Sequence, residues 1–279
     1  MNPLVSPAWL ASRLQDPTLV IVDATLPPVG VVPTVDTRSR YLAQHLPGAV
    51  FFDIEELSDH SSGLPHTMPS PEAFSRAMAA LGIGDGMTIV VYEQAGVFSA
   101  PRARWMLRTF GAQNVFLLDG GLAAWLEAGL PTESGPVQRP TASFAAKLDP
   151  NAVRNYRQIQ QAIADAGQIV DARSAGRFAG TAPEPRPGLS SGHMPGSISL
   201  PFTELVEGGR LKDPAKLREI FLAKDIDLDG PITTTCGSGV TAAVIAIGLE
   251  IAGTKQVSLY DGSWAEYAQQ PDAMIEKAG

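Results

Sequence analysis

The sequence predicts an α/β fold made of two similar halves, each a mainly parallel sheet flanked by helices. Short apolar runs of strand length alternate with segments of helical periodicity through most of the 279 residues. Landmarks of the first half recur in the same order in the second half. The hydrophobic content of 44% and charged content of 18% are those of a globular chain with enough apolar material for two cores.

Four landmarks recur and indicate a duplication of domain size. An apolar run that ends near an aspartate, Leu19–Ala24, returns as Gln168–Arg173 at an offset of 148 residues. A pair of His-X-Pro-Gly segments has the same offset, whereas a later Asp-Gly pair is offset by 142. The first copy therefore carries about six extra residues, which we place in the loop Ser58–Met68. The remaining paired landmarks are His45–Ala49 with His193–Ser197, Val115–Gly121 with Val257–Ser263, and Trp125 with Tyr267.

Each copy is expected to contain four main strands, and their loops carry the chemistry of such sheets. Ser70 followed by Pro71 is a helix-start signal. In the first copy we expect strands near 19–24, 49–52, 88–93 and 115–119, and helices near 71–81, 100–110 and 121–128. In the second copy we expect strands near 168–172, 197–200, 231–235 and 257–260, and helices near 155–165, 213–223, 240–252 and 263–268.

A stretch with several prolines and few strong apolar runs separates the two copies. It extends from Leu130 to Pro150 and reads as a linker between domains. We therefore expect a non-catalytic domain at 1–135, a linker at 136–150 and a catalytic domain at 151–279.

Composition excludes several classes of function. The net charge of −8 argues against non-specific binding of nucleic acid or anionic membranes. A single cysteine rules out an intrachain disulfide and fits a reducing compartment, so we expect a cytoplasmic protein. The N-terminal residues lack the pattern of a signal or transit peptide, and the most apolar window is too short to span a bilayer. The four histidines and one cysteine have no metal-ligand spacing.

The single cysteine, Cys236, lies in a glycine-rich turn between an expected strand and an expected helix. Gly237 and Gly239 allow backbone N–H groups to converge on one point, and the helix N-terminus adds partial positive charge there. These features favour the thiolate, which is the nucleophilic form. The alternative is a buried cysteine that acts as a small hydrophobic residue. The glycines on either side of Ser238 favour the reactive thiol.

The first copy has the corresponding loop without the nucleophile. At the offset of 142 residues Gln94 falls opposite Cys236, and Ser99-Ala100 falls opposite Thr241-Ala242. One active and one silent copy suggest a site at a domain interface, to which the silent copy contributes a wall or a side chain. The alternative is a first copy that only stabilises the second.

Taken together, these motifs resemble the two-domain rhodanese-type sulfurtransferases over essentially the whole chain. The shared features are Asp-Ala-Arg followed by Gly-Arg-Phe at 171–178, the two His-X-Pro-Gly segments, the loop at 236–243 and Asp-Gly-Ser-Trp at 261–264. The loop Cys-Gly-Ser-Gly-Val-Thr resembles that of the 3-mercaptopyruvate sulfurtransferases, whereas thiosulfate-preferring rhodaneses carry two basic residues there. A neutral loop suits a donor whose single charge is a distant carboxylate, and two cations suit the thiosulfate dianion.

The resemblance also implies roles for individual residues. Arg177 and Arg186 match the arginines that hold the donor's carboxylate and keto oxygen, whereas Arg173 is expected to hold local loops. The relay of the family matches Ser238, His66 and Glu55, where Glu55 stands in place of an aspartate. His45 and His193 recur in both copies and are expected to be structural. The residues expected to bind the donor's sulfur around Cys236 are Gly237, Gly239, Val240 and Thr241.

The function expected from the resemblance is transfer of sulfur from 3-mercaptopyruvate to Cys236 as a persulfide, with release of pyruvate. The acceptor would be a small thiol, thioredoxin or cyanide, and no metal or organic cofactor is expected. The nearest alternative is a thiosulfate:cyanide sulfurtransferase. A Cys-dependent phosphatase would need an arginine where Ala242 stands. A non-catalytic sulfur-carrier or regulatory module is the remaining alternative.

Overall fold

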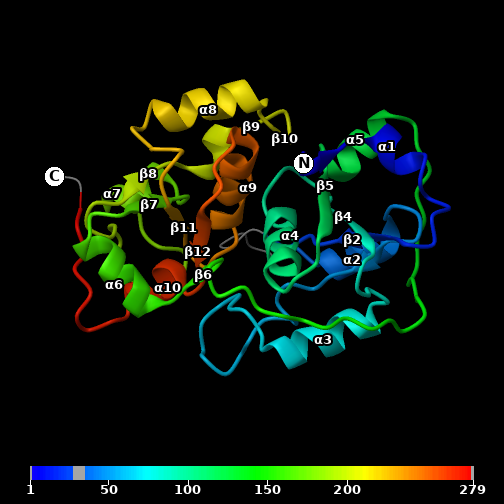
Figure 1. Cartoon of the computed structure of the whole chain (residues 1–279), viewed down its shortest axis with the longest axis horizontal. Helices are drawn as coiled ribbons and strands as arrows, with labels where there is room; N and C mark the ends of the chain where they lie inside the picture. The colour runs from blue at the N-terminus through cyan, green and yellow to red at the C-terminus, as the bar shows by residue number, and fades with distance from the viewer. Residues whose placement is uncertain (1, 28–34, 278–279) are drawn as a thin grey trace. The chain divides into compact units, whose positions relative to one another are not determined.

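The computed structural model describes residues 2–27 and 35–277 of the chain (Figure 1). Contacts within the chain divide it into two compact units. The first unit consists of Met1–Asp59, Met68–Asp149 and Gly208–Arg210, and the second of His60–Thr67, Pro150–Glu207 and Leu211–Gly279. His60–Thr67 therefore packs with the second unit although it belongs to the first half of the sequence, and Gly208–Arg210 packs with the first unit although it belongs to the second half.

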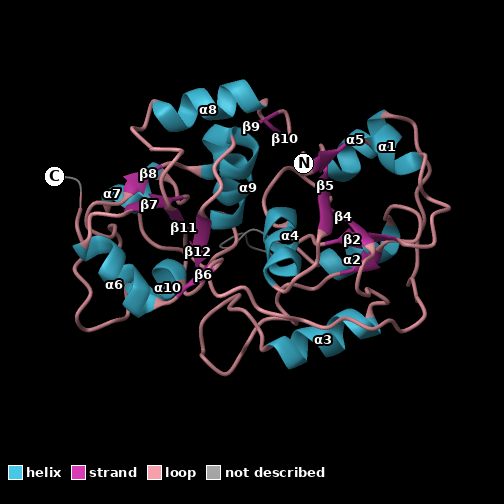
Figure 2. Cartoon of the chain, in the orientation of Figure 1, coloured by secondary structure: helices cyan, strands magenta, loops and turns pink. Residues whose placement is uncertain are grey.

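The sheet of the first unit is parallel throughout and has the strand order β1-β5-β4-β2-β3. Figure 2 labels β5, β4 and β2 of this sheet. Its central strand β4 continues into helix α4 through the loop at 93–99. The strands are β1 (Leu4–Val5), β2 (Leu19–Asp23), β3 (Val50–Phe51), β4 (Thr88–Tyr92) and β5 (Asn114–Leu118). The helices are α1 (Pro7–Ala11), α2 (Thr37–Ala43), α3 (Pro71–Ala80), α4 (Ala100–Thr109) and α5 (Gly121–Glu127).

The second unit repeats this topology with the order β6-β12-β11-β7-β8, again with parallel pairing. The strands are β6 (Val153–Arg154), β7 (Gln168–Asp171), β8 (Ile198–Ser199), β11 (Ile232–Thr235) and β12 (Val257–Tyr260). The helices are α6 (Tyr156–Ala164), α7 (Ala175–Ala179), the 3₁₀ helix Phe202–Leu205, α8 (Pro214–Leu222), α9 (Ala242–Ala252) and α10 (Ser263–Tyr267). A small hairpin pairs β9 (Val206–Glu207) with β10 (Arg210–Leu211). The identical order of strands confirms the duplicated α/β fold with helices flanking each sheet.

Local sequence explains where the main helices begin. The hydroxyl of Ser70 accepts the N–H of Ala73, and Pro71 fills the first helical position of α3. Asn155 and Gln158 form a reciprocal capping box at the start of α6. Helix α9 is apolar almost all round and is buried along most of its length, so the strand and helix on either side of Cys236 are both held in the core.

The segment expected to be a linker, 136–150, is partly bonded to the first unit. The carbonyl oxygen of Ser143 accepts the N–H of Asp85 at 2.8 Å, and Lys147 donates its N–H to Phe110 O at 3.0 Å. Phe144 is buried and packs edge-on against Phe74. The domain boundaries expected at 135 and 151 stay a prediction, but these contacts show that the segment is a packed connection.

The two histidines of the repeated His-X-Pro-Gly segments hold the chain at equivalent places. His45 forms an antiparallel bridge with Glu133, and His193 forms one with Glu276. Both rings also bind backbone carbonyls, since His45 Nε2 lies 3.0 Å from Gly135 O and His193 Nδ1 lies 2.9 Å from Phe178 O. These contacts agree with the structural role expected for both residues. Among the described helices, none is both long enough and apolar enough to cross a bilayer.

Candidate active site

Cys236 follows the central strand of the second sheet and is 2% exposed. Its carbonyl oxygen accepts the N–H of Trp264 at 2.9 Å, and Gly237 O accepts the N–H of Ala265 at 3.0 Å. The N–H of Cys236 lies 3.4 Å from the hydroxyl of Ser263, a buried residue with φ of 51°. The first turn of α10 therefore fixes the backbone of the cysteine loop at its start.

The rest of the cysteine loop presents backbone donors. Gly239 adopts a φ of 77°, which a glycine tolerates at little cost and which turns the chain toward α9. In the part of the chain that the structure describes, the N–H groups of Gly237, Ser238, Val240 and Thr241 donate to no protein acceptor. Buried N–H groups need a partner, so this loop is suited to an anion at the cysteine sulfur.

The hydroxyl of Ser238 joins two other residues that the sequence predicted. His66 Nδ1 lies 2.9 Å from Ser238 Oγ, and Arg186 Nη2 donates to the same oxygen at 3.4 Å. Ser238 and His66 are buried, and His66 has a φ of 60°, which is unusual for a residue other than glycine. The segment His60–Thr67 packs in the second unit, so the loop insertion of the first repeat supplies this histidine to the cysteine loop.

Arg177 lies directly against the cysteine loop. A Cβ atom added at Gly237 would meet Arg177 Nη2 at 2.8 Å, so the absence of a side chain at 237 permits this approach. Arg177 donates from Nε to Glu184 Oε2 at 3.1 Å, and its side chain keeps 22% of its surface exposed. The two arginines that the sequence singled out therefore both lie beside the loop at 236–241.

Glu55, the acid expected in the relay, belongs to the other unit. Its backbone N–H donates to Asp53 Oδ1 at 3.1 Å, and the residue is exposed. A part for Glu55 in the relay stays a prediction. Within the described residues, no cluster of three or more His, Cys, Asp or Glu side chains is arranged to hold a metal ion.

Comparison with known proteins agrees with the duplicated fold. The sequence pattern of the rhodanese-like domain matches residues 6–128 and again residues 155–270. The chain belongs to the rhodanese-like family. It carries two copies of the domain, as the resemblance in the sequence implied.

Relatives in this family match almost the full length of the chain. It is 45% identical to the 3-mercaptopyruvate sulfurtransferase of Escherichia coli K12 over 96% of this chain and 95% of that protein. It is 42% identical to the human 3-mercaptopyruvate sulfurtransferase over 99% of this chain and 96% of that protein. The bovine thiosulfate sulfurtransferase is 41% identical over 95% of this chain and 91% of that protein. The crystal structure of the 3-mercaptopyruvate sulfotransferase from Escherichia coli superposes with a TM-score of 0.88 at 43% identity, covering 95% of this chain and 99% of that one.

The first rhodanese-like copy has a glutamate at the position of the cysteine. Tyr92, the last residue of β4, pairs with the last residue of β2, as the last residue of β11 pairs with the last residue of β7. The next residues along the chain, Glu93 and Cys236, are therefore equivalent. Placing Gln94 opposite Cys236 was wrong, because the loop of the first copy is one residue longer before its helix begins.

The carboxylate of Glu93 fills the loop of the first copy. Oε1 accepts the N–H groups of Phe98 at 2.7 Å, Ser99 at 3.1 Å and Ala100 at 3.1 Å, and Oε2 accepts the hydroxyl of Ser99 at 3.2 Å. Burial raises the pKa of Glu93 to about 7, although the N–H donors act in the opposite direction. The loop before α4 is therefore a carboxylate-binding loop whose occupant belongs to the chain itself.

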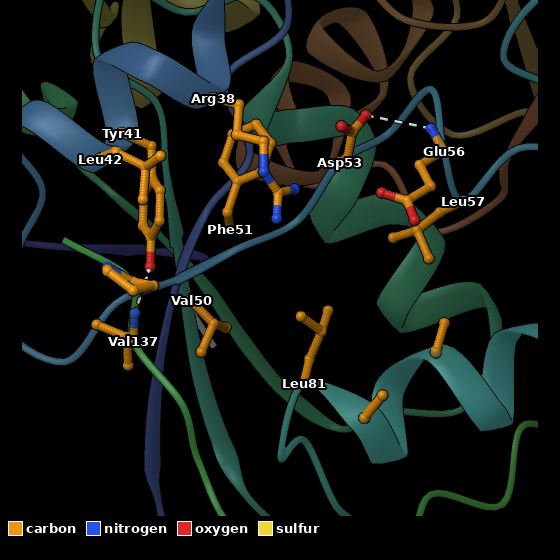
Figure 3. A pocket seen from close by; sticks show the side chains of 13 residues that line it. Arg38, Tyr41, Leu42, Val50, Phe51, Asp53, Glu56, Leu57, Leu81 and Val137 are labelled. Atoms are coloured by element: carbon orange, nitrogen blue, oxygen red, sulfur yellow. Dashed lines mark hydrogen bonds between the residues drawn. The ribbon is translucent and has the colours of Figure 1, made fainter.

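A cavity of about 310 Å³ lies elsewhere in the first unit (Figure 3). Apolar side chains such as Leu57 and Leu81 line it, together with Arg38 and Tyr41. None of the residues predicted to take part in chemistry lines this cavity. The candidate active site therefore remains the loop around Cys236.

The substitution Glu93→Gln tests the buried carboxylate in the first loop. The folded protein keeps a proton on Glu93 up to about pH 7, whereas an ordinary glutamate loses it near 4.5. The wild type should therefore lose up to about 3 kcal/mol of stability as the pH rises through this window, and the variant should not. Urea denaturation at pH 5, 6.5 and 8 measures the difference.

The matched control is Glu127→Gln, because the side chain of Glu127 is 74% exposed. This variant should keep the pH dependence of the wild type. A gap between the wild type and Glu93→Gln that stays constant from pH 5 to 8 would show that Glu93 does not titrate in this window.

Proposed function

We propose that the protein is a sulfurtransferase that takes sulfur from 3-mercaptopyruvate and passes it to a thiol acceptor. The Cys236 thiolate attacks the donor's sulfur, and the carbon–sulfur bond breaks. The bonding electrons leave with pyruvate as its enolate, which then takes up a proton, while Cys236 is left as a persulfide. The observation that carries this proposal is a buried cysteine in a loop where the N–H groups of Gly237, Ser238, Val240 and Thr241 donate to no described protein acceptor, with two arginines beside it.

The first copy supports the proposed role of the loop N–H groups from within the same chain, because there they bind a carboxyl group. There the corresponding loop holds the carboxylate of Glu93 by the N–H groups of three successive residues. In the second copy the equivalent position carries a thiol, and N–H groups of the loop, such as those of Ser238 and Val240, are proposed to bind the thiolate and the outer sulfur of the persulfide. Gly237, Gly239, Val240 and Thr241 are the proposed contributors to this cradle.

Arg177 and Arg186 are proposed to hold the other end of the donor. A guanidinium group binds a carboxylate by parallel charge-assisted hydrogen bonds, and 3-mercaptopyruvate carries its carboxylate two carbons away from the sulfur-bearing carbon. The short distance from Arg186 to Ser238 and from Arg177 to Gly237 supports this assignment. The donor's sulfur and carboxylate are then recognised by separate groups.

The proton for the enolate is proposed to come from Ser238, from His66 or from water. The hydroxyl of Ser238 lies between His66 and Arg186, so a proton that the hydroxyl gives to the enolate can be replaced from the protonated His66 ring beside it. Glu55 is retained as a candidate third member of this relay. The serine and histidine contribute to the proposal by their geometry, and Glu55 by resemblance alone.

The choice of donor rests on the loop, because overall identity does not separate the two activities. The relatives named for mercaptopyruvate are 45% and 42% identical, and the bovine thiosulfate sulfurtransferase is 41% identical. The residues after Cys236 are neutral here, which disfavours a dianionic donor. Thiosulfate:cyanide transfer is the second candidate. A small thiol, thioredoxin or cyanide is proposed as acceptor, and a cytoplasmic location is still a prediction.

Treatment with 3-mercaptopyruvate should make the protein heavier by one sulfur atom, because the persulfide on Cys236 is covalent. Intact mass spectrometry before and after treatment measures the gain, and pyruvate release is followed in parallel. The matched control is Cys236→Ser, which should neither gain the mass nor release pyruvate. An unchanged wild-type mass while pyruvate is still released would rule out the persulfide route.

Arg177→Ala and Arg186→Ala should each lower kcat/KM for 3-mercaptopyruvate by about 1.5–3 kcal/mol in transition-state terms, the range for a hydrogen bond to a charged group. Their effect with thiosulfate should be smaller, because thiosulfate has no carboxylate. Steady-state kinetics with both donors measure the loss of kcat/KM for each donor. Arg157→Ala, an exposed position on α6, is the control. Equal losses with both donors would mean that the arginines support the loop and do not bind the carboxylate.

A further inference from the structure

Four charged side chains of alternating sign, three of them buried, lie in a row in the second unit and end at the cysteine loop. Asp171 binds Arg173 at 2.6 Å, and Arg173 binds Glu184 at 2.8 Å. Glu184 in turn binds Arg177, with a distance of 3.1 Å from its Oε2 to Nε. The side chains of Asp171, Arg173 and Glu184 are each 1% exposed, so solvent screens these contacts very little.

The row of charges starts and ends beside Cys236. Asp171 pairs in the sheet with Thr235, the residue before the cysteine. Arg173 lies over the ring of Trp264 at 4.0 Å, and the N–H of Trp264 binds the carbonyl of Cys236. At the other end, Arg177 Nη2 occupies the space beside Gly237. The position of Arg177 is thus tied to the backbone that carries the nucleophile.

Glu184 determines which edge of Arg177 is available. Both Nε and Nη2 of Arg177 donate to Glu184 Oε2, which uses the side edge of the guanidinium group. Among the described residues Nη1 has no partner, so the end edge, with Nη1 and the second hydrogen of Nη2, is left for a ligand. A free arginine side chain would lose considerable rotamer entropy on binding, and the contact with Glu184 removes part of that cost in advance.

Within residues 2–27 and 35–128, the silent copy lacks the same arrangement. Its counterpart of Asp171 is Asp23, and Thr25 stands where the second copy has Arg173. The carboxylate of Asp23 accepts the hydroxyl of Thr25 and the amide of Gln94. The row of charges therefore accompanies the cysteine and is not a general requirement of the repeated fold.

We propose that Glu184 is a positioning residue that aims the end edge of Arg177 at the carboxylate of the sulfur donor. This inference rests on the function proposed above. Glu184 itself touches no donor atom and acts only through Arg177. Its loss should therefore weaken use of a carboxylate-bearing donor and leave the chemistry at Cys236 intact.

A double-mutant cycle with Glu184→Gln and Arg177→Ala tests this coupling. With 3-mercaptopyruvate, Glu184→Gln should lower kcat/KM about tenfold, mostly through KM, because the charged hydrogen bonds to Arg177 are weakened. In the Arg177→Ala background the same substitution should cause less than about a twofold further loss, since its target is gone. With thiosulfate, Glu184→Gln should have little effect in either background.

Equal fold losses in both backgrounds, or equal losses with both donors, would overturn the proposal. Glu184→Asp is a second variant, because it keeps the charge and is too short to bridge both arginines; it should show the same donor-specific loss if the glutamine variant does not fold. Glu219→Gln on α8, 68% exposed, is the matched control and should behave as wild type.

Sulfur loading of the wild type separates this proposal from the proposed function. If 3-mercaptopyruvate loads the wild type and the cycle is additive, only the role of Glu184 is wrong. If 3-mercaptopyruvate does not load the wild type at all, the proposed function fails and the role of Glu184 fails with it.

Discussion

In both copies, the loop between the central strand and the following helix presents backbone N–H groups that the helix itself does not bind. Such groups are costly when buried without an acceptor, and the helix that begins there adds positive potential. The first copy satisfies them with the carboxylate of Glu93. The second copy has Cys236 at that position, and in the proposed function a thiolate or persulfide fills the place of the carboxyl group. The two loops thus differ in length by one residue and in whether the residue after the strand fills the loop with its own carboxyl group.

The sequence predicted the longer elements well, because their patterns are local. The buried strands near 19–24 and 88–93 and the capped helix near 71–81 agree with β2, β4 and α3 within a residue or two. The two-residue edge strands β1 and β6 and the five-residue helices α1 and α7 were missed, since such short segments carry no periodicity. The seven-residue helix α2 and the hairpin β9–β10 were also missed.

The sequence predicted individual residues of the site, but it did not predict the contacts between them. Cys236, Ser238 and Arg186 were identified by motif, and the structure brings the last two together with His66. Gln94 was wrongly placed opposite Cys236 because one extra loop residue shifts the alignment, and the strand register shows that Glu93 is the equivalent residue. Glu184 was not singled out, although it lies between the two arginines in the sequence. Its role depends on a buried contact with Arg173 that no spacing rule indicates.

The position of Arg177 also bears on donor preference. A Cβ atom at 237 would meet Arg177 Nη2 at 2.8 Å, so a side chain at 237 requires the end of the Arg177 side chain to shift. In the proposed function Arg177 binds the donor's carboxylate, so a basic side chain at 237 would disturb carboxylate recognition as well as add charge near the sulfur. The glycine after the cysteine is thus the position at which the proposal couples loop charge to carboxylate binding.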